Sequence, residues 1–186
     1  MRLLVVIWLA ILPTPAVWGR PAQIILLRHA EKPGGHFDAD LSQHGRLRAQ
    51  ALVPFLTTNS VFLTNGRPTA LFAPKLTARG HGRRAEETLG PLAEYLKLPI
   101  QMPVGSKAHA ALAKRVLTDP ALEGRTVVIC WVHEFLPDLA REFCVQPKPE
   151  RWREDVYDRV WVITYGKKHA HLANLPQHLL PGDSAK

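Results

Sequence analysis

The chain has 186 residues, 46% of them hydrophobic, and a formal charge of +8 at pH 7. This length and composition suffice for one domain around one core, which we expect to span residues 20–186. The positive charge favours anionic partners such as phosphorylated metabolites. The basic residues are spread along the chain without a Lys/Arg block or an interleaved aromatic stripe, so we expect no specific binding of nucleic acid.

Residues 1–19 are typical of a secretory signal peptide. Arg2 is followed by an apolar run over residues 3–12 and then by small and turn-forming residues, with cleavage expected after Ala16 or Gly19. The apolar run is too short to cross a bilayer of about 30 Å as a helix. We therefore expect an exported protein, periplasmic or secreted, with no transmembrane anchor after processing.

Residues 24–27 form a short, continuous apolar run, the pattern of a strand covered on both faces. Arg28 and His29 follow at its C-terminal end, where catalytic groups gather in open α/β sheets. An arginine and a histidine at such a point can hold an anion and attack it. The alternative interpretation is an ordinary loop histidine beside a solvated arginine.

Beyond this strand, helical and extended patterns alternate along the chain. Helices are predicted over residues 43–56, 84–96, 108–117 and 134–143, and strands over 69–72, 126–132, 156–164 and 169–175. In the first helix Ser42 is the expected N-cap, and the buried stripe is expected to contain Leu47, Ala51, Leu52 and Leu56. We expect the tail, residues 181–186, to be frayed.

This alternation predicts an α/β fold, a three-layer α/β/α sandwich around a mainly parallel mixed sheet. The last two strands, joined by a turn at residues 166–168, predict an antiparallel edge hairpin. Cys130 and Cys144 either pair as a disulfide in an oxidising compartment or stay as free thiols.

Two histidines and two arginines are predicted to lie near the ends of buried strands. The predicted strand 126–132 ends in His133, just as the first strand ends in His29, and Arg84 opens the helix after a third strand. If the strand ends lie together, these side chains and Arg28 surround one point. Arginines donate to phosphate oxygens in pairs and a neutral imidazole can attack phosphorus, so the set predicts a phosphate site that requires no metal.

The same residues carry a family resemblance. The motifs are Arg28-His29-Ala30, Leu41-Ser42-Gln43-His44-Gly45, Arg48-Ala49-Gln50-Ala51, Arg84-Ala85-Glu86-Glu87-Thr88 and the late His133. In order and approximate spacing they resemble the histidine phosphatase (phosphoglycerate mutase-like) superfamily. The resemblance covers most of the chain after residue 19.

The resemblance implies roles for the matching positions. His29 would be the nucleophile that becomes phosphohistidine, while Arg28, Arg84 and His133 would bind the phosphoryl oxygens and stabilise the transferring group. Ser42 would cap its helix and Gly45 would permit close packing. No cofactor or metal is implied.

The sequence leaves two candidates for the general acid. In the smaller mutase-like branch a glutamate follows the arginine-bearing helix, but residues 99–109 contain no carboxylate. Glu134, directly after His133, resembles the acid of the acid-phosphatase branch and would protonate the leaving oxygen. It could instead cap its helix. Glu31 is the alternative acid, although an ion pair with Lys32 is equally compatible with the sequence.

The second phosphate-binding arginine has alternatives as well. A longer basic loop replaces the serine-rich strand end that family members often have, so Arg79 or Arg83 could take the role assigned to Arg84. We favour Arg84 because Thr88 fits the pattern that follows the family arginine.

These observations predict an exported, metal-independent phosphatase that hydrolyses phosphomonoesters through a phosphohistidine on His29. The substrate would be a phosphorylated small molecule, a glycan or a phosphoprotein. The alternative is a non-catalytic phospholigand-binding or envelope-interaction protein with the same fold. A histidine-rich metal protein is disfavoured because His169 and His171 belong to no set with zinc-ligand spacing.

Overall fold

A computed structural model describes residues 19–34, 39–78, 80–166 and 169–184 of the chain. The predicted signal peptide therefore lies outside the described residues, except for Gly19, and Arg79 lies outside them too. Within the described ranges, every helix is too short or too polar to span a bilayer.

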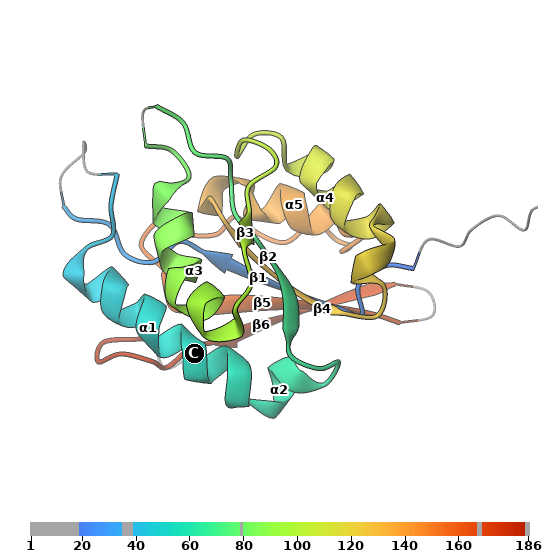
Figure 1. Cartoon of the computed structure of the whole chain (residues 1–186), viewed down its shortest axis with the longest axis horizontal. Coiled ribbons are helices and arrows are strands. Elements are labelled where there is room, and N and C mark those ends of the chain that lie inside the picture. The colour runs from blue at the N-terminus through green and yellow to red at the C-terminus, as the bar shows by residue number, and fades with distance from the viewer. Residues whose placement is uncertain (1–18, 35–38, 79, 167–168, 185–186) are drawn as a thin grey trace, which may run out of the picture.

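A six-stranded sheet forms the centre of the molecule (Figure 1). Its strands, in chain order, are β1 (Gln23–Arg28), β2 (Pro68–Phe72), β3 (Ile100–Gln101), β4 (Thr126–Trp131), β5 (Arg159–Tyr165) and β6 (Ala170–Pro176). They are arranged in the order β3-β2-β4-β1-β5-β6, in which β3, β2, β4 and β1 are parallel. β5 runs antiparallel to β1, and β6 antiparallel to β5. The predicted α/β fold, with a mainly parallel sheet and an antiparallel edge hairpin, is confirmed.

Helices cover both faces of the sheet. They are α1 (Gln43–Thr58), α2 (Ser60–Leu63), α3 (Arg83–Leu96), α4 (His109–Thr118) and α5 (Leu136–Glu142), with short 3₁₀ helices η1 (Pro120–Leu122) and η2 (His133–Phe135). Side chains alternate between the faces of a strand. Ile25 of β1 accordingly belongs to one buried cluster with residues of α1 and α3, and Ile24 to another with residues of α4 and α5. Three layers result (Figure 1).

The buried stripe of α1 differs from the prediction at two positions. Leu47 is 50% exposed and Ala51 is only partly buried, whereas Leu52 and Leu56 are buried as expected. The side chain of Arg48 occupies the buried face instead, only 3% exposed. A charged side chain can be buried there because carboxylates from two other segments neutralise it.

The prediction of a frayed tail is wrong for the part that the structure describes. The Asp183 carboxylate accepts hydrogen bonds from Arg48 at 2.6 and 3.0 Å and from the backbone amides of Leu179 and Leu180. The next residue, Ser184, donates to Asp158. The tail is therefore held against the domain by specific polar contacts that hydrophobic periodicity does not reveal.

Several element boundaries also differ. The predicted helix 134–143 begins as the 3₁₀ turn η2 and becomes α-helical at Leu136, and the predicted strand 156–164 begins only at Arg159. α3 runs through Pro91 without a break. Neither α2 nor the two-residue strand β3 was predicted. Cys130 and Cys144 are free thiols in the structure, the first buried and the second exposed.

Candidate active site

β1 and β4 bring the two histidines to the same edge of the sheet. The strands are parallel neighbours in which Arg28 lies opposite Trp131. His29 follows β1 directly and its backbone amide donates to the Trp131 carbonyl at 3.3 Å, while His133 begins two residues after β4. The carboxyl ends of parallel strands are where ligand sites form in open α/β sheets.

The imidazole of His29 is buried and oriented. Its Nδ1 lies 2.8 Å from the Ala30 carbonyl oxygen. Because a carbonyl only accepts, Nδ1 carries the proton and Nε2 keeps its lone pair. Burial lowers the pKa of His29 to about 3, and the hydrogen bond to Ala30 opposes this, while the charges of Arg28 and Arg84 lower it further. The ring is therefore neutral at neutral pH, the state required of a nucleophile.

Arg28 is fixed by backbone carbonyls rather than by a carboxylate. Its Nη1 donates to the carbonyls of Arg153, Glu154 and Val156 at 3.2, 2.7 and 2.9 Å. The guanidinium carbon lies 3.8 Å from the centroid of the Tyr157 ring. These contacts hold the guanidinium plane in one orientation.

The opposite edge of the Arg28 guanidinium has no oxygen acceptor among the described residues. Nη2 lies 3.4 Å from Nδ1 of His133, and Nε is buried and has no hydrogen-bond partner among the described residues. Nε and Nη2 form the edge with which arginine binds two oxygens of a phosphate. An unpaired buried donor costs free energy, so an oxyanion at this edge would relieve an existing penalty.

Two of the three candidate arginines differ in their surroundings, and the third, Arg79, lies outside the described residues. Arg83 is 52% exposed and its Nε contacts Asp40 at 2.5 Å and Glu87 at 3.3 Å. Arg84 is half-buried, and its charge acts on the His29 imidazole. Of the two described arginines, Arg84 is thus the one whose charge lowers the pKa of His29, whereas Arg83 is engaged in ion pairs at the surface.

His133 is half-buried beside Arg28. Burial and then the charge of Arg28 lower the pKa of His133, which favours its neutral form, while the charges of Glu154 and Glu134 oppose the change. A neutral ring beside a cation can donate one hydrogen bond to a phosphoryl oxygen.

The three carboxylates around the site have different partners. Glu31 is engaged by Arg48, whose Nη2 lies 2.7 Å and whose Nε lies 2.9 Å from Oε1. Lys32 pairs with Glu154 at 2.9 Å, so the ion pair between Glu31 and Lys32 considered from the sequence does not form. Glu134 is exposed and close enough to His133 for its charge to act on that ring.

Thr88 and Gly45 hold the segment that follows His29. The Thr88 hydroxyl accepts from the Ala30 amide at 2.9 Å and donates to the Arg84 carbonyl at 2.6 Å. At Gly45 an added Cβ would collide with the backbone of Glu31. Ser42 caps α1 by accepting from the Gly45 amide at 3.0 Å, so the predicted structural roles of Ser42 and Gly45 are confirmed.

The structure adds Tyr157, Glu154 and the bridging role of Thr88 to the residues predicted from the sequence. The first two belong to the irregular loop before β5, for which no motif gives a position in space. Thr88 was recognised only as part of a motif. Across the described ranges, no group of three or more His, Cys, Asp or Glu side chains is arranged to hold a metal ion.

No family model matches the chain, and no curated protein matches it. Two solved structures are similar. An alpha-ribazole-5'-P phosphatase from Escherichia coli K-12, provisionally so named, aligns with a TM-score of 0.59 and 15% identity over 84% of this chain and 97% of its own. A mycobacterial glucosyl-3-phosphoglycerate phosphatase, solved with inorganic phosphate, aligns with a TM-score of 0.53 and 14% identity. The alignment covers 83% of this chain and 95% of that phosphatase. The chain thus has the fold of the histidine phosphatases.

Proposed function

We propose that the protein is a metal-independent phosphatase that hydrolyses phosphomonoesters through a phosphohistidine on His29. The observation that carries the proposal is the state of His29: a buried, neutral ring whose Nδ1–H is held by the Ala30 carbonyl, between two arginines. That arrangement leaves Nε2 as a nucleophile in an electropositive setting.

In the first step Nε2 of His29 attacks phosphorus, the N–P bond forms and the ester P–O bond breaks. Arg28, Arg84 and His133 stabilise the charge on the phosphoryl oxygens. The leaving oxygen takes a proton from Glu134. In the second step the Glu134 carboxylate accepts a proton from water, the oxygen of that water bonds to phosphorus, the N–P bond breaks and phosphate leaves.

Glu134 is preferred as the acid because the other two carboxylates are engaged. Glu31 is bound by Arg48. The hydrogen bond from Lys32 lowers the pKa of Glu154, which makes that residue a poor proton donor. Glu134 is exposed next to His133 and has no such partner among the described residues.

The substrates are proposed to be phosphorylated small molecules, the class named for both structural neighbours, with glycans and phosphoproteins as further members. Export is proposed from the leader-like sequence of residues 1–19 alone. Cell fractionation and the intact mass of the mature chain test it: a cytoplasmic chain that retains Met1 contradicts export.

Turnover is tested with an aryl phosphate in the presence of a chelator. Wild type is expected to retain activity and to gain one phosphoryl group, stable to base and labile to acid, in rapid-quench mass spectra. His29→Ala is expected to lose at least about a thousandfold in kcat and to lose the adduct. His171→Ala, an exposed histidine of β6, is the matched control and is expected to behave as wild type.

Activity that survives in His29→Ala, or that the chelator abolishes, contradicts the proposal. The second candidate is a phospholigand-binding protein without turnover, which the exposure of Glu134 and the commitment of Arg28 Nη1 to carbonyls favour. Saturable phosphate binding that depends on Arg84 but comes with no turnover identifies that candidate.

A further inference from the structure

A concave site lies beside the loop whose carbonyls bind Arg28. It is a groove of about 570 Å³ between the β5–β6 hairpin and the loop before it, lined by Pro149, Glu150, Arg151, Trp152, Arg153, Val156, Arg159, Trp161, Leu172, Asn174 and Ser184. Its volume is in the range of sites for small organic ligands. None of the four residues proposed for phosphate transfer, His29, Arg28, Arg84 and His133, belongs to this described lining.

The floor of the groove is apolar and rigid. The rings of Trp152 and Trp161 pack with centroids 4.7 Å apart, and both residues are at most 5% exposed. The Trp152 indole N–H donates to the Val156 carbonyl at 2.9 Å, which fixes that ring in the loop. Such a preformed surface binds an apolar body with little loss of side-chain entropy.

Arg159 supplies an oriented donor in the wall of this groove. Its Nε donates to Oδ1 of Asn174 at 2.9 Å and its Nη2 to the Asn174 carbonyl at 2.8 Å. Its Nη1 is buried and has no hydrogen-bond partner among the described residues. None of the carboxylates placed by the structure forms a salt bridge with Arg159, so this lining residue keeps its charge and one donor without an acceptor.

The remaining charges leave the lining positive. Arg153 is paired with Asp155 at 2.5 and 3.0 Å, which largely cancels its charge. Arg151 is exposed and forms no salt bridge with any described residue, while Glu150 is the acidic member of the lining and is exposed as well. An apolar floor beside an oriented guanidinium is complementary to an amphipathic anion.

We propose that this groove binds a small organic anion with an aromatic or other apolar body and one acidic group. An oxygen of that group accepts a hydrogen bond from Nη1 of Arg159, and the apolar body lies over Trp152 and Trp161. The groove shares with the His29 site only the loop that binds Arg28, and its existence does not depend on the proposed phosphatase activity.

A matched pair of dyes tests the proposal by fluorescence titration at low ionic strength. Anilinonaphthalene sulfonate carries the apolar body and the anion, and N-phenylnaphthylamine carries the body alone. Wild type is expected to bind the sulfonate at one site, and more tightly than the neutral dye. Arg159→Gln is expected to weaken sulfonate binding about ten- to a hundredfold and to change binding of the neutral dye little.

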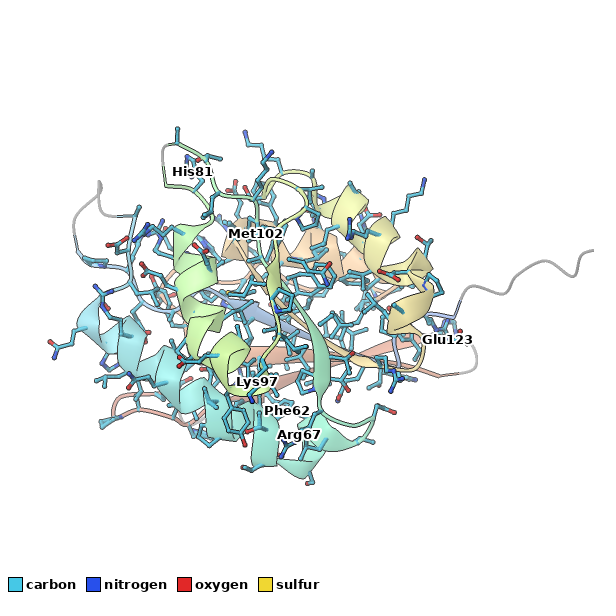
Figure 2. All side chains as sticks on the ribbon, viewed as in Figure 1. Phe62, Arg67, His81, Lys97, Met102 and Glu123 are labelled. Atoms are coloured by element: carbon cyan, nitrogen blue, oxygen red, sulfur yellow. The ribbon has the colours of Figure 1, made fainter. Side chains whose placement is uncertain are left out.

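Three variants control for net charge, for folding and for the His29 site. Arg67→Gln removes the same charge at the exposed turn before β2, at the end of the molecule opposite His81 (Figure 2), and is expected to bind as wild type. Arg84→Gln is also expected to bind the sulfonate as wild type. Arg151→Gln, at an exposed position of the groove, is expected to weaken binding about two- to fivefold.

Equal affinity of wild type for the two dyes, or wild-type affinity in Arg159→Gln, overturns the proposal. A loss in Arg84→Gln equal to that in Arg159→Gln places the dye at the His29 site and also overturns it. If Arg159→Gln does not retain the wild-type thermal transition, the test rests on Arg151→Gln. In that case, equal sulfonate affinities of Arg151→Gln and Arg67→Gln refute binding in the groove.

Discussion

At the scale of single residues, the charge state of His29 follows from its burial. The folded-state pKa of about 3 lies below the value near 6.5 of an exposed imidazole. As pH falls below about 6.5 the unfolded chain binds a proton at His29, and the folded protein does so only near pH 3. Stability from this group is therefore complete above pH 6.5 and is lost progressively as pH falls from 6.5 to 3.

We predict that His29→Gln flattens the pH dependence of stability. One proton bound only by the unfolded state gives a slope of at most about 1.4 kcal/mol per pH unit. Urea unfolding between pH 6 and 4 should show wild type losing stability more steeply than His29→Gln by roughly 1 kcal/mol per unit. His171→Gln, at an exposed position, is the control and should follow wild type. Parallel slopes in wild type and His29→Gln would contradict a neutral, buried ring.

Leaving-group dependence should identify the general acid. Loss of a proton donor hurts poor leaving groups most, so Glu134→Gln is expected to lower kcat about 10²–10³-fold for an alkyl phosphate and much less for a nitrophenyl phosphate. Glu154→Gln, which removes the partner of Lys32, is the matched control and should change both rates only a few-fold. A selective loss on alkyl phosphate in Glu154→Gln instead would assign the acid to Glu154.

At the scale of elements, the site depends on parallel strands and on one helix that faces their ends. The register of β1 with β4 sets the positions of His29 and His133 at the edge of the sheet. α3 is joined to the segment after His29 through the Thr88 hydroxyl, which contacts both Ala30 and Arg84. One buried side chain therefore links the segment after His29 to Arg84.

We predict that Thr88→Val weakens both stability and turnover. The Ala30 amide would lose its acceptor in a buried position, which costs about 1–3 kcal/mol of unfolding free energy. In saturating substrate kcat should fall about tenfold, because the segment bearing His29 is no longer held. Thr118→Val is a matched control, since the Thr118 hydroxyl also donates to the carbonyl four residues earlier but at an exposed helix end. Equal effects of the two substitutions would refute the linking role.

At the scale of the whole molecule, a buried charge network joins three segments that are distant in the sequence. Arg48 of α1 binds both Glu31, two residues after His29, and Asp183, near the end of the chain. Its guanidinium also donates to Gln177 at 3.0 Å. The tail thereby becomes part of the support beneath the candidate site.

We predict that Asp183→Asn destabilises the protein by about 3 kcal/mol, because a buried arginine loses a partner. Burial raises the pKa of Asp183, but hydrogen bonds from Arg48 and from two amides outweigh it and lower the pKa to about 2. The stabilisation is hence complete above about pH 4 and is lost as pH falls to 2. Chemical unfolding at pH 7 and pH 3 tests this, with a smaller difference between variant and wild type expected at pH 3.

Glu142→Gln serves as the control for the network, since its ion pair with Arg141 is on the surface. Exposed pairs contribute about 0–1 kcal/mol, so this variant should unfold close to wild type. If the tail contributes nothing to stability, Asp183→Asn should change the unfolding free energy as little as Glu142→Gln does.

Local patterns in the sequence were sufficient to predict the two buried strands β1 and β4 and the histidine that follows each of them. The apolar runs of β1 and β4 are continuous because both faces are covered, and a histidine follows each run. Ser42 and Gly45 were also interpretable locally, because a helix cap and a close backbone approach depend on residue type. By contrast, Leu47 is exposed although it was predicted to be buried, and Arg48 is buried in its place, since the partners of Arg48 lie elsewhere in the chain.

The sequence by itself therefore determined the α/β class, the parallel strands and the histidine at each strand end, because these depend on periodicity and on residues adjacent in the chain. Only the tertiary structure decided that the charge of Arg84 acts on His29 while Arg83 forms ion pairs at the surface, that Glu31 pairs with Arg48 and Lys32 with Glu154, and that the tail is bound to Arg48. Charge pairing and burial depend on distances between segments far apart in sequence, and packing alone sets those distances.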